Sequence, residues 1–286
     1  MGAITTAFVK QFGSTLETLV QQKGSRLMGA VRMENDLNGE EKYYDQVGEE
    51  TASLKTTRHA DVEYAADDYQ RRRVVPVDVY WAKLIDKEDK LKMLIDPTST
   101  LLQSGQWAIG RKIDDLIIAA ASGTAYTGKA GGTSTALPTA QKIVYASSGL
   151  TLAKLLAAKE ILDGADVDPE EERFIALTAD QVTDLLNTTE VKNADYNTVK
   201  ALAAGQINTF LGLRFILCNR LALDGSSHRL ILCWAKSGLL LAQASGMFSS
   251  IDRLPVKHYA TQAYASISCG STRMQEEKVV EIACEE

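Results

Sequence analysis

The stretch that comes nearest to a chemical motif is a glycine-framed segment ending in lysine. Gly123 to Lys129 fits the G-x-x-x-x-G-K pattern of a phosphate-binding loop. The next residue is Ala130, so the hydroxyl that would hold magnesium is missing. A phosphate loop also follows a strand and opens a helix, whereas this segment follows a predicted helix and runs into further glycine and threonine. We interpret it as a flexible loop that ends a helix.

The other reactive side chains are too scattered to form a site. The acidic cluster around Pro169 lacks the spacing of a calcium loop and is interpreted as a solvated surface turn. The histidines and cysteines include no C-x-x-C pair and no nucleophile with a partner, which predicts buried free thiols and no zinc site. We therefore assign no catalytic, cofactor-binding or metal-binding residue. The residues considered are Asp163, Asp166, Asp168, Glu170, Glu171, Glu172, His59, His228, His258, Cys218, Cys233, Cys269 and Cys284.

Charges between residues 61 and 73 are better suited to recognising another protein. Asp67 and Asp68 are followed closely by Arg71, Arg72 and Arg73. Arginine forks that meet carboxylates across an interface form directional ion pairs. We therefore expect these five residues to pair between subunits, with a self-neutralising exposed loop as the alternative. A nucleic-acid patch is not expected, because the neighbouring acids cancel the positive field that phosphate contacts need.

These charges lie on a predicted two-armed ribbon. Residues 43–47 form its ascending arm, residues 48–58 its polar tip, and residues 74–81 its descending arm. A lone two-stranded hairpin is marginally stable in water, and its edges invite pairing with another chain. We therefore expect the ribbon to lie on a neighbouring copy, which favours a self-assembling structural protein over an enzyme.

A helix is predicted before the ribbon, from Thr5 and Thr6 as caps to about Gly24. Its apolar residues recur three or four apart and form one stripe. The stripe must dock on another part of the chain or on another subunit. Its first members, Phe8, Phe12 and Leu16, are therefore candidate inter-subunit contacts.

The remaining sequence indicates helices first and a mixture of helices and strands after them. A helix over 82–94 precedes the best-marked helix, which opens with Asp96 and Pro97 and stops at Gly123. Residues 123–138 are predicted to be a loop. Further elements are a helix at 152–162, a buried strand at 174–177, a helix at 179–187, strands at 210–217 and 229–241, and antiparallel strands over 256–284. The predicted fold class is α+β.

Composition limits the remaining choices. The chain has 286 residues, is 45% hydrophobic and carries a formal net charge of -6, so it can bury a core but is a poor default binder of nucleic acid. The first residues lack the pattern of a signal peptide, and no window approaches 18 apolar residues. We expect synthesis in the cytoplasm and no membrane partner.

The order of these parts resembles the tailed-bacteriophage major capsid proteins of the Hong Kong 97 fold. The resemblance rests on the order of the elements and on a set of short stretches that span nearly the whole chain. None of these stretches is a catalytic signature, so the specificity lies in the set and its order. They are Gln22–Leu27, Arg71–Val74, Leu91–Ser99, Asp114–Ala121, Asp184–Asn187 and Gly270–Val280.

The resemblance implies a division of the chain into four parts. Residues 1–40 would be an N-terminal arm, and 41–82 an extended loop (the E-loop) lying over an adjacent subunit. A peripheral domain would comprise 83–144 and 251–286, with a spine helix at 97–122. Residues 145–250 would form an α/β axial domain that meets its copies at the centre of each capsomer.

The resemblance also implies partners. Many copies, as hexamers and pentamers, would close into an icosahedral head shell around packaged double-stranded DNA, in the virion, after assembly in the cytoplasm of the host bacterium. Because only residues 1–40 precede the ribbon, a separate scaffolding protein is expected. A portal is a further expected partner, and a cement or decoration protein is another candidate. The DNA would lie inside without sequence-specific binding.

Two alternatives stay open at this point. An encapsulin-type compartment shares the fold and houses enzymes, so protein cargo in place of DNA and a portal would identify it. A cytoplasmic oligomeric α/β enzyme would need a cleft with convergent titratable groups, and the sequence offers none.

Overall fold

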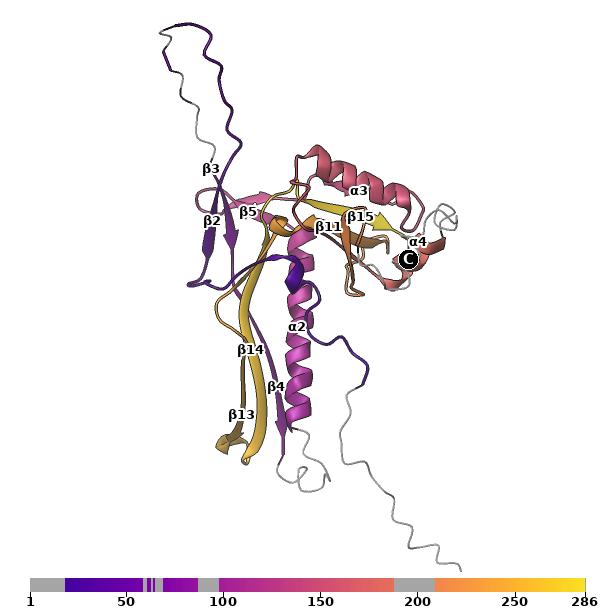
Figure 1. Ribbon diagram of the computed structural model, residues 1–286. Coiled ribbons are helices and arrows are strands. Elements are labelled where there is room, and N and C mark those ends of the chain that lie inside the picture. Colours follow the sequence, from indigo (N-terminus) through magenta and orange to yellow (C-terminus); the bar gives the residue numbers. More distant parts are fainter. Residues whose placement is uncertain are drawn as a thin grey trace, which may run out of the picture.

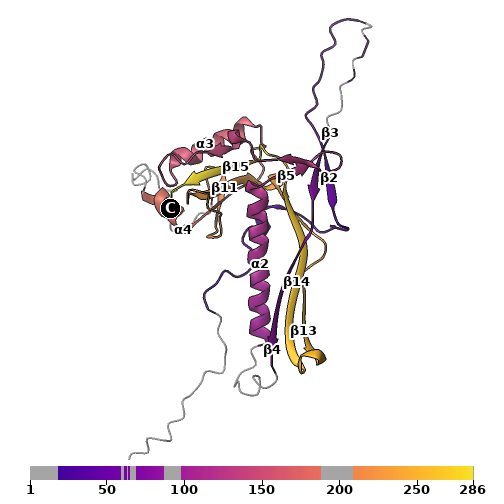
Figure 2. The ribbon, with the colours of Figure 1, turned by 180° about the vertical axis from the view of Figure 1, so that it is seen from behind.

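A long helix and a long β-ribbon run side by side through the lower half of the molecule, below a body of mixed helices and strands (Figure 1). A hairpin projects upward past this body, and the view from behind shows the same projection (Figure 2). The computed structural model describes residues 19–58, 61–62, 64, 69–86, 98–187 and 209–285. The architecture is α+β, with one appendage well separated from the remainder.

The long helix α2 covers Thr98–Ser122. Its 25 residues span about 37 Å at about 1.5 Å per residue. It stops where the N–H of Gly123 donates to the carbonyl of Ala119 at 2.9 Å. Its buried apolar residues recur every four positions, which is why one face docks on the ribbon and the arm: Ile109, Ile113, Ile117 and Ala121. The predicted long helix is confirmed.

The long β-ribbon beside α2 is a five-stranded sheet built around β14 (Ala260–Arg273), and it is distinct from the two-armed ribbon predicted from the sequence. One edge of β14 pairs antiparallel with β4 (Val77–Ile85). Alternate residues of β14 are buried towards α2, as the period of two in a strand requires. The other edge of β14 pairs with β12 and then β13, and β1 adds parallel to β12. Their bounds are β12 Leu239–Gln243, β13 Phe248–Leu254 and β1 Arg32–Glu34, with a short helical turn, η4, at Pro255–Lys257.

The body contains a six-stranded sheet in the order β7-β15-β11-β8-β10-β9. β8 lies between β11 and β10 and is buried at all five residues, which confirms the predicted buried strand. α3 packs against β15 on one face of this sheet. The bounds are β7 Lys142–Ile143, α3 Leu152–Gly164, β8 Arg173–Leu177, α4 Ala179–Asn187, β9 Thr209–Phe210, β10 Leu213–Leu217, β11 Arg229–Ala235 and β15 Val279–Cys284, with a short turn, η2, at Thr139–Gln141.

The projecting hairpin is part of a third sheet in the order β2-β3-β5-β6, in which every neighbouring pair is antiparallel. β2 and β3 form the hairpin, and a second, short hairpin of β5 and β6 follows directly after α2. The second hairpin docks on β3. The bounds are β2 Lys42–Val47, β3 Tyr69–Val74, β5 Ala125–Thr127 and β6 Thr133–Thr135.

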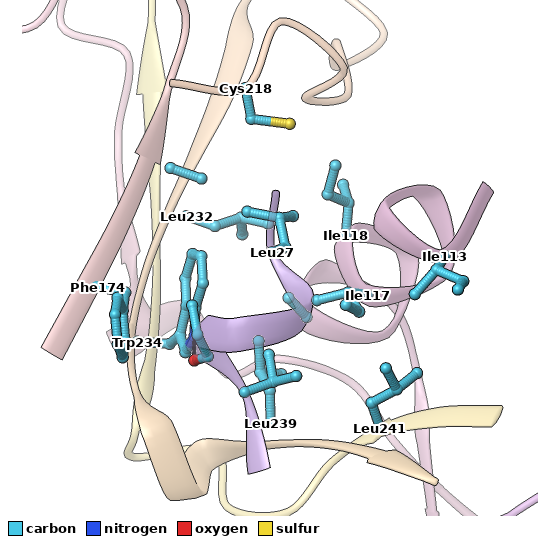
Figure 3. Packing of buried hydrophobic residues seen from close by; sticks show 14 of the residues in the cluster. Leu27, Ile113, Ile117, Ile118, Phe174, Cys218, Leu232, Trp234, Leu239 and Leu241 are labelled. Atoms are coloured by element: carbon cyan, nitrogen blue, oxygen red, sulfur yellow. Dashed lines mark hydrogen bonds between the residues drawn. The ribbon is translucent and has the colours of Figure 1, made fainter. Parts of the chain in front are cut away.

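The main core lies where the N-terminal segment, α2 and two sheets meet (Figure 3). Leu27 lies between the isoleucines of α2 and the aromatic ring of Trp234 (Figure 3). The indole Nε1 of Trp234 donates to the carbonyl of Ala30 at 2.9 Å. Phe174 of β8 faces this core, whereas its neighbour Ile175 faces a second core under α3. The six-stranded sheet is therefore covered on both faces.

At the N-terminus the structure differs from the predicted helix. Residues 19–24 are irregular, and only a short helical turn, η1 (Met28–Ala30), follows. Leu27 is buried as part of the main core. The backbone N–H groups of Arg26 and Leu27 donate to a side chain of α2, which is why they do not continue a helix. The earlier part of the predicted helix lies outside the described residues.

The descending arm of the predicted two-armed ribbon, residues 74–81, also differs from its prediction. Residues 69–74 pair with β2, whereas β4 leaves the hairpin and pairs with β14. The helix predicted from Ala82 is wrong over Ala82–Ile85, which is strand. An alternating pattern marks a strand but does not choose its partner, so β4 was assigned to the wrong neighbour. Residues 87–94 lie outside the described part of the chain.

Two further segments differ in secondary structure from their predictions. The predicted loop over 123–138 contains β5 and β6. The predicted strand at 229–241 is split by a short turn, η3 (Lys236–Gly238), which carries the chain from the six-stranded sheet into the ribbon. β15 pairs with β11 in the six-stranded sheet, and the expected division of the chain into four parts stays a prediction.

Candidate functional site

The projecting hairpin, defined here as residues 42–74, is the most exposed appendage in the described part of the molecule. Its strands pair from Lys42 with Val74 to Val47 with Tyr69. Beyond Val47 the described residues of the tip form no regular structure and are nearly all exposed. Among them are Leu54 and Tyr64, each 92% exposed. The described part of the tip therefore leaves these apolar side chains uncovered by their own chain.

Two arginines of β3 pair with acids across the hairpin. Arg71 donates from Nε and Nη2 to the carboxylate of Asp45 at 2.5 and 3.2 Å. These hydrogen bonds lower the pKa of Asp45 below its ordinary value of 3.8. Arg73 donates from Nη1 to Glu41 at 3.1 Å, and its guanidinium lies 4.8 Å from the ring centroid of Tyr126. Both pairs are partly exposed, so solvent screens them and they contribute little to stability.

Arg72, between these two, points into the body and is 3% exposed. Its Nη1 and Nη2 donate to the two carboxylate oxygens of Glu276 at 2.8 and 2.5 Å. The same carboxylate lies 3.4 Å from Nε of Arg273, which is fully buried. Arg273 also donates to the carbonyls of Ala121 and Gly123 at the end of α2, at 2.9 and 2.8 Å. The base of the hairpin is thus joined to the end of the long helix.

The glycine-framed segment, Gly123–Lys129, contains β5 and the start of the turn that leads from β5 to β6. Gly128 and Gly131 adopt left-handed φ values of +87° and +61°. A Cβ on Gly131 would lie 2.6 Å from Cδ of Arg73 and 3.0 Å from Cε1 of Tyr43, so this turn packs tightly against the hairpin. No helix begins after it, as a phosphate-binding loop would require. The segment thus contains a strand where the sequence predicted a flexible loop, and the turn at 128–132 that follows this strand packs against the hairpin.

The N-terminal arm, described here over residues 19–34, is clamped to the middle of α2 by one carboxylate. Asp114 is fully buried and accepts the backbone N–H groups of Arg26 and Leu27, at 3.0 and 3.1 Å. It also accepts the hydroxyl of Ser25 and the side-chain amide of Gln22, each at 2.5 Å. A buried carboxylate is stable only with such a set of donors. Residues 22–27 therefore dock on their own chain.

The arm can approach α2 closely because Gly110 of this helix has no side chain. A Cβ on Gly110 would lie 2.6 Å from the backbone nitrogen of Ser25 and 2.7 Å from Cα of Gly24. The next residue, Arg111, donates to the side chain of Gln21 and to the carbonyl of Gln22. Before these contacts, Leu19 and Val20 are exposed. The arm is thus held from about residue 21 onwards.

The predicted contact residues fall into three groups. Phe8, Phe12, Leu16, Asp67 and Asp68 lie outside the described residues, so their assignment stays a prediction. Arg71 and Arg73 have partners within the hairpin region, as in the alternative of a self-neutralising loop.

Arg72 is corrected from an exposed interface residue to a buried intrachain pair with Glu276. The sequence could not reveal this partner, because Glu276 lies 204 positions away. Neither Asp114 nor Glu276 was singled out from the sequence as a functional residue. The only signal for Asp114 is a carboxylate next to apolar residues of a helical stripe.

The remaining titratable groups are structural. All four cysteines are free and buried, as predicted, and burial raises the pKa of Cys233 to about 12. In the acidic cluster, Asp163 pairs with Lys159 and Arg173, and its pKa is lowered by their hydrogen bonds. Across the described ranges, no group of His, Cys, Asp and Glu is arranged to hold a metal ion. None of the described helices is long and apolar enough to cross a bilayer.

Comparison with known proteins decides what such a chain is. The model of one family, described as phage capsid protein, matches residues 4–286. The chain belongs to the phage capsid protein family. It is a major capsid protein that forms the head shell of a bacteriophage, and its place is the virion capsid. A comparison with curated protein sequences gives no match.

Solved capsid structures share the fold of this capsid protein. The capsid structure of cyanophage P-SCSP1u matches with a TM-score of 0.75 and 16% identity, covering 98% of this chain and 94% of that chain. The capsid of cyanophage Pam1 matches with a TM-score of 0.74 and 14% identity, over 98% and 97% of the two chains. The capsid of Ralstonia phage GP4 gives 0.72 and 11%, over 97% and 95%. The predicted fold class and family are confirmed.

Proposed function

We propose that the capsid protein assembles as hexamers and pentamers into an icosahedral shell around double-stranded DNA, and that the projecting hairpin and the N-terminal arm make its contacts between copies. One observation carries this proposal. The tip displays Leu54, Val62 and Tyr64 with 92%, 72% and 92% of their surface exposed. The burial of such side chains on a neighbouring copy supplies the apolar area that an obligate interface needs.

Charge supports a shell that holds DNA without binding it tightly. The formal net charge of -6 gives little attraction for phosphates, so packaged DNA would slide along the wall instead of adhering to it. Because ordering costs offset most of the gain at each interface, individual contacts are weak and the closed shell is durable. The protein is then a structural component without enzymatic activity of its own.

Deletion of the tip tests the role of the hairpin. Removal of residues 48–68, with a short turn joining the two strands, leaves the ion pairs of the base in place. We expect folded, soluble subunits that form no shells by electron microscopy. As a matched control, Glu49→Ala, Thr51→Ala and Ser53→Ala in one variant change the same tip but leave its apolar residues. Intact shells from the deletion variant would contradict the role proposed for the hairpin.

Other partners follow from the same proposal. We expect a separate scaffolding protein and a portal to act during assembly in the host bacterial cytoplasm, with a cement or decoration protein as a further candidate. Co-expression with the neighbouring phage genes, followed by mass spectrometry of purified shells, tests these partners. Shells that contain DNA and a portal are expected. Shells that enclose a protein cargo and no portal would favour an encapsulin-type compartment instead.

A further inference from the structure

Three buried charges lie at the point where the projecting hairpin leaves the body. Arg72 of β3 is 3% exposed, Arg273 at the end of β14 is 0% exposed, and Glu276 is 7% exposed. The carboxylate of Glu276 takes both terminal nitrogens of Arg72 and faces Nε of Arg273. Each arginine belongs to a different sheet, so Glu276 is the group that ties the two sheets together at this point.

Arg273 extends the connection to two further elements. Its Nη1 donates to the last carbonyls of α2, and its Nη2 donates to the carbonyl of Thr135 in β6 at 2.9 Å. The negative end of the helix dipole lies at these carbonyls, which offsets the second positive charge of the cluster. Glu276 and Arg273 together therefore connect the hairpin, the end of the long helix, the sheet of β14 and the β5–β6 hairpin.

A buried bidentate ion pair can fix the direction of one structural element relative to another. Bidentate arginine–carboxylate contacts fix an orientation as well as a distance. Buried ion pairs add little net stability compared with apolar packing, whereas they penalise every arrangement in which one charge loses its partner. Arg71 and Arg73, on the same strand, pair only with residues of the hairpin and its immediate surroundings. Arg72 alone of the three reaches the body.

We propose that Glu276 is a positioning residue that sets the direction in which the hairpin projects from the long helix, through Arg72 on one side and Arg273 on the other. The part of the hairpin near its base then moves with the body as one unit, and only the tip adapts to a neighbour. This inference rests on the proposed function in one respect: the direction of the hairpin matters because the hairpin contacts other copies.

A label-distance measurement on unassembled subunits tests the proposal without requiring shells. Val47→Cys at the end of β2 and Lys112→Cys on α2 place two spin labels at exposed positions, and the four native cysteines are buried. In Glu276→Gln, which keeps the shape of the side chain but not its charge, we expect the distance distribution to broaden about twofold. Asp45→Asn is the matched control, since it removes the carboxylate of the exposed pair on the same hairpin, and its distribution should stay narrow.

A second variant keeps the test decisive if Glu276→Gln does not fold. Arg72→Lys retains the charge but loses the two-point contact, so it should fold and show intermediate broadening. A purely structural role would lower the melting temperature and leave the distance distribution of the folded subunits unchanged. Wild-type width in a folded Glu276→Gln or Arg72→Lys subunit would overturn the proposal. Failure of the proposed function would instead show as wild-type subunits that form no shells.

Discussion

The carboxylate of Asp114 accepts the backbone N–H of Leu27 at 3.1 Å, which joins the middle of the long helix to an arm residue 87 positions earlier. Leu27 then enters the main core beside Ile117 and Trp234. From about residue 21 onwards the arm is therefore a component of its own subunit.

Asp114→Asn should release this arm. The amide keeps one acceptor but adds two donors facing the N–H groups of Arg26 and Leu27, so we expect a loss of about 2–4 kcal/mol in unfolding free energy. Urea unfolding and hydrogen exchange at residues 25–27 measure it. Asp115→Asn is the matched control, because its pair with Arg220 is partly exposed, and it should cost less than about 1 kcal/mol. Equal losses in the two variants would refute the clamp.

Gly131→Ala should loosen the brace at the base of the hairpin. Its φ of +61° and the contact with Arg73 that a Cβ would make both oppose a side chain, so we expect a cost of about 1–2 kcal/mol. Gly132→Ala is the control, since a Cβ there meets nothing within 4 Å. That change should be neutral or slightly stabilising. Thermal unfolding compares the two, and a stable Gly131→Ala variant would contradict the packing of the turn.

Lys154 holds the last strand in place, and its loss should be costly. The side chain is 6% exposed, burial lowers its pKa, and its ammonium lies within 3.1 Å of four carbonyl oxygens, those of Tyr145, Ser148, Gly149 and Ala283. Lys154→Met leaves these acceptors without a donor, so we expect a loss of about 3 kcal/mol. Lys159→Met, on the exposed face of the same helix, is the control. Faster hydrogen exchange in β15 should accompany the loss, and unchanged exchange there would argue against this role.

Acid should break the ion pair between Arg71 and Asp45. The hydrogen bonds from Arg71 lower the pKa of Asp45, so the pair stabilises the hairpin above the ordinary value of 3.8 and that contribution is lost as the pH falls through the lowered value. The NMR signal of the Nε–H of Arg71 should therefore shift as the pH falls below about 4, because its partner carboxylate is then protonated. In Asp45→Asn this step should be absent. A step of equal size in the variant would assign it to other carboxylates.

Local patterns in the sequence predicted elements well and their partners poorly. The helix at 98–122 and the strand at 173–177 follow from a stripe of isoleucines with a glycine stop and from an unbroken apolar run. The partner of β4 and the hairpin of β5 and β6 do not follow, because period-two patterns and small polar residues fit several neighbours equally well. Such choices depend on contacts between distant parts of the chain.

The candidate site shows the same division. The projecting hairpin was predicted from its polarity and its lack of a partner, and its position on the surface agrees. The role of Arg72 was not predicted, because a row of three arginines does not reveal which one points inward to Glu276. From the sequence, an aspartate on a helix is expected to be exposed. Asp114 is buried because the arm covers it and donates hydrogen bonds to it.

Cryo-electron microscopy of the purified protein, expressed in bacteria with its neighbouring phage genes, tests the central claim most directly. The account predicts closed icosahedral shells of many copies, with the tip of each projecting hairpin in contact with another subunit. Dispersed subunits whose hairpin and arm both fold back on their own body, with no larger particles at any protein concentration, would contradict it.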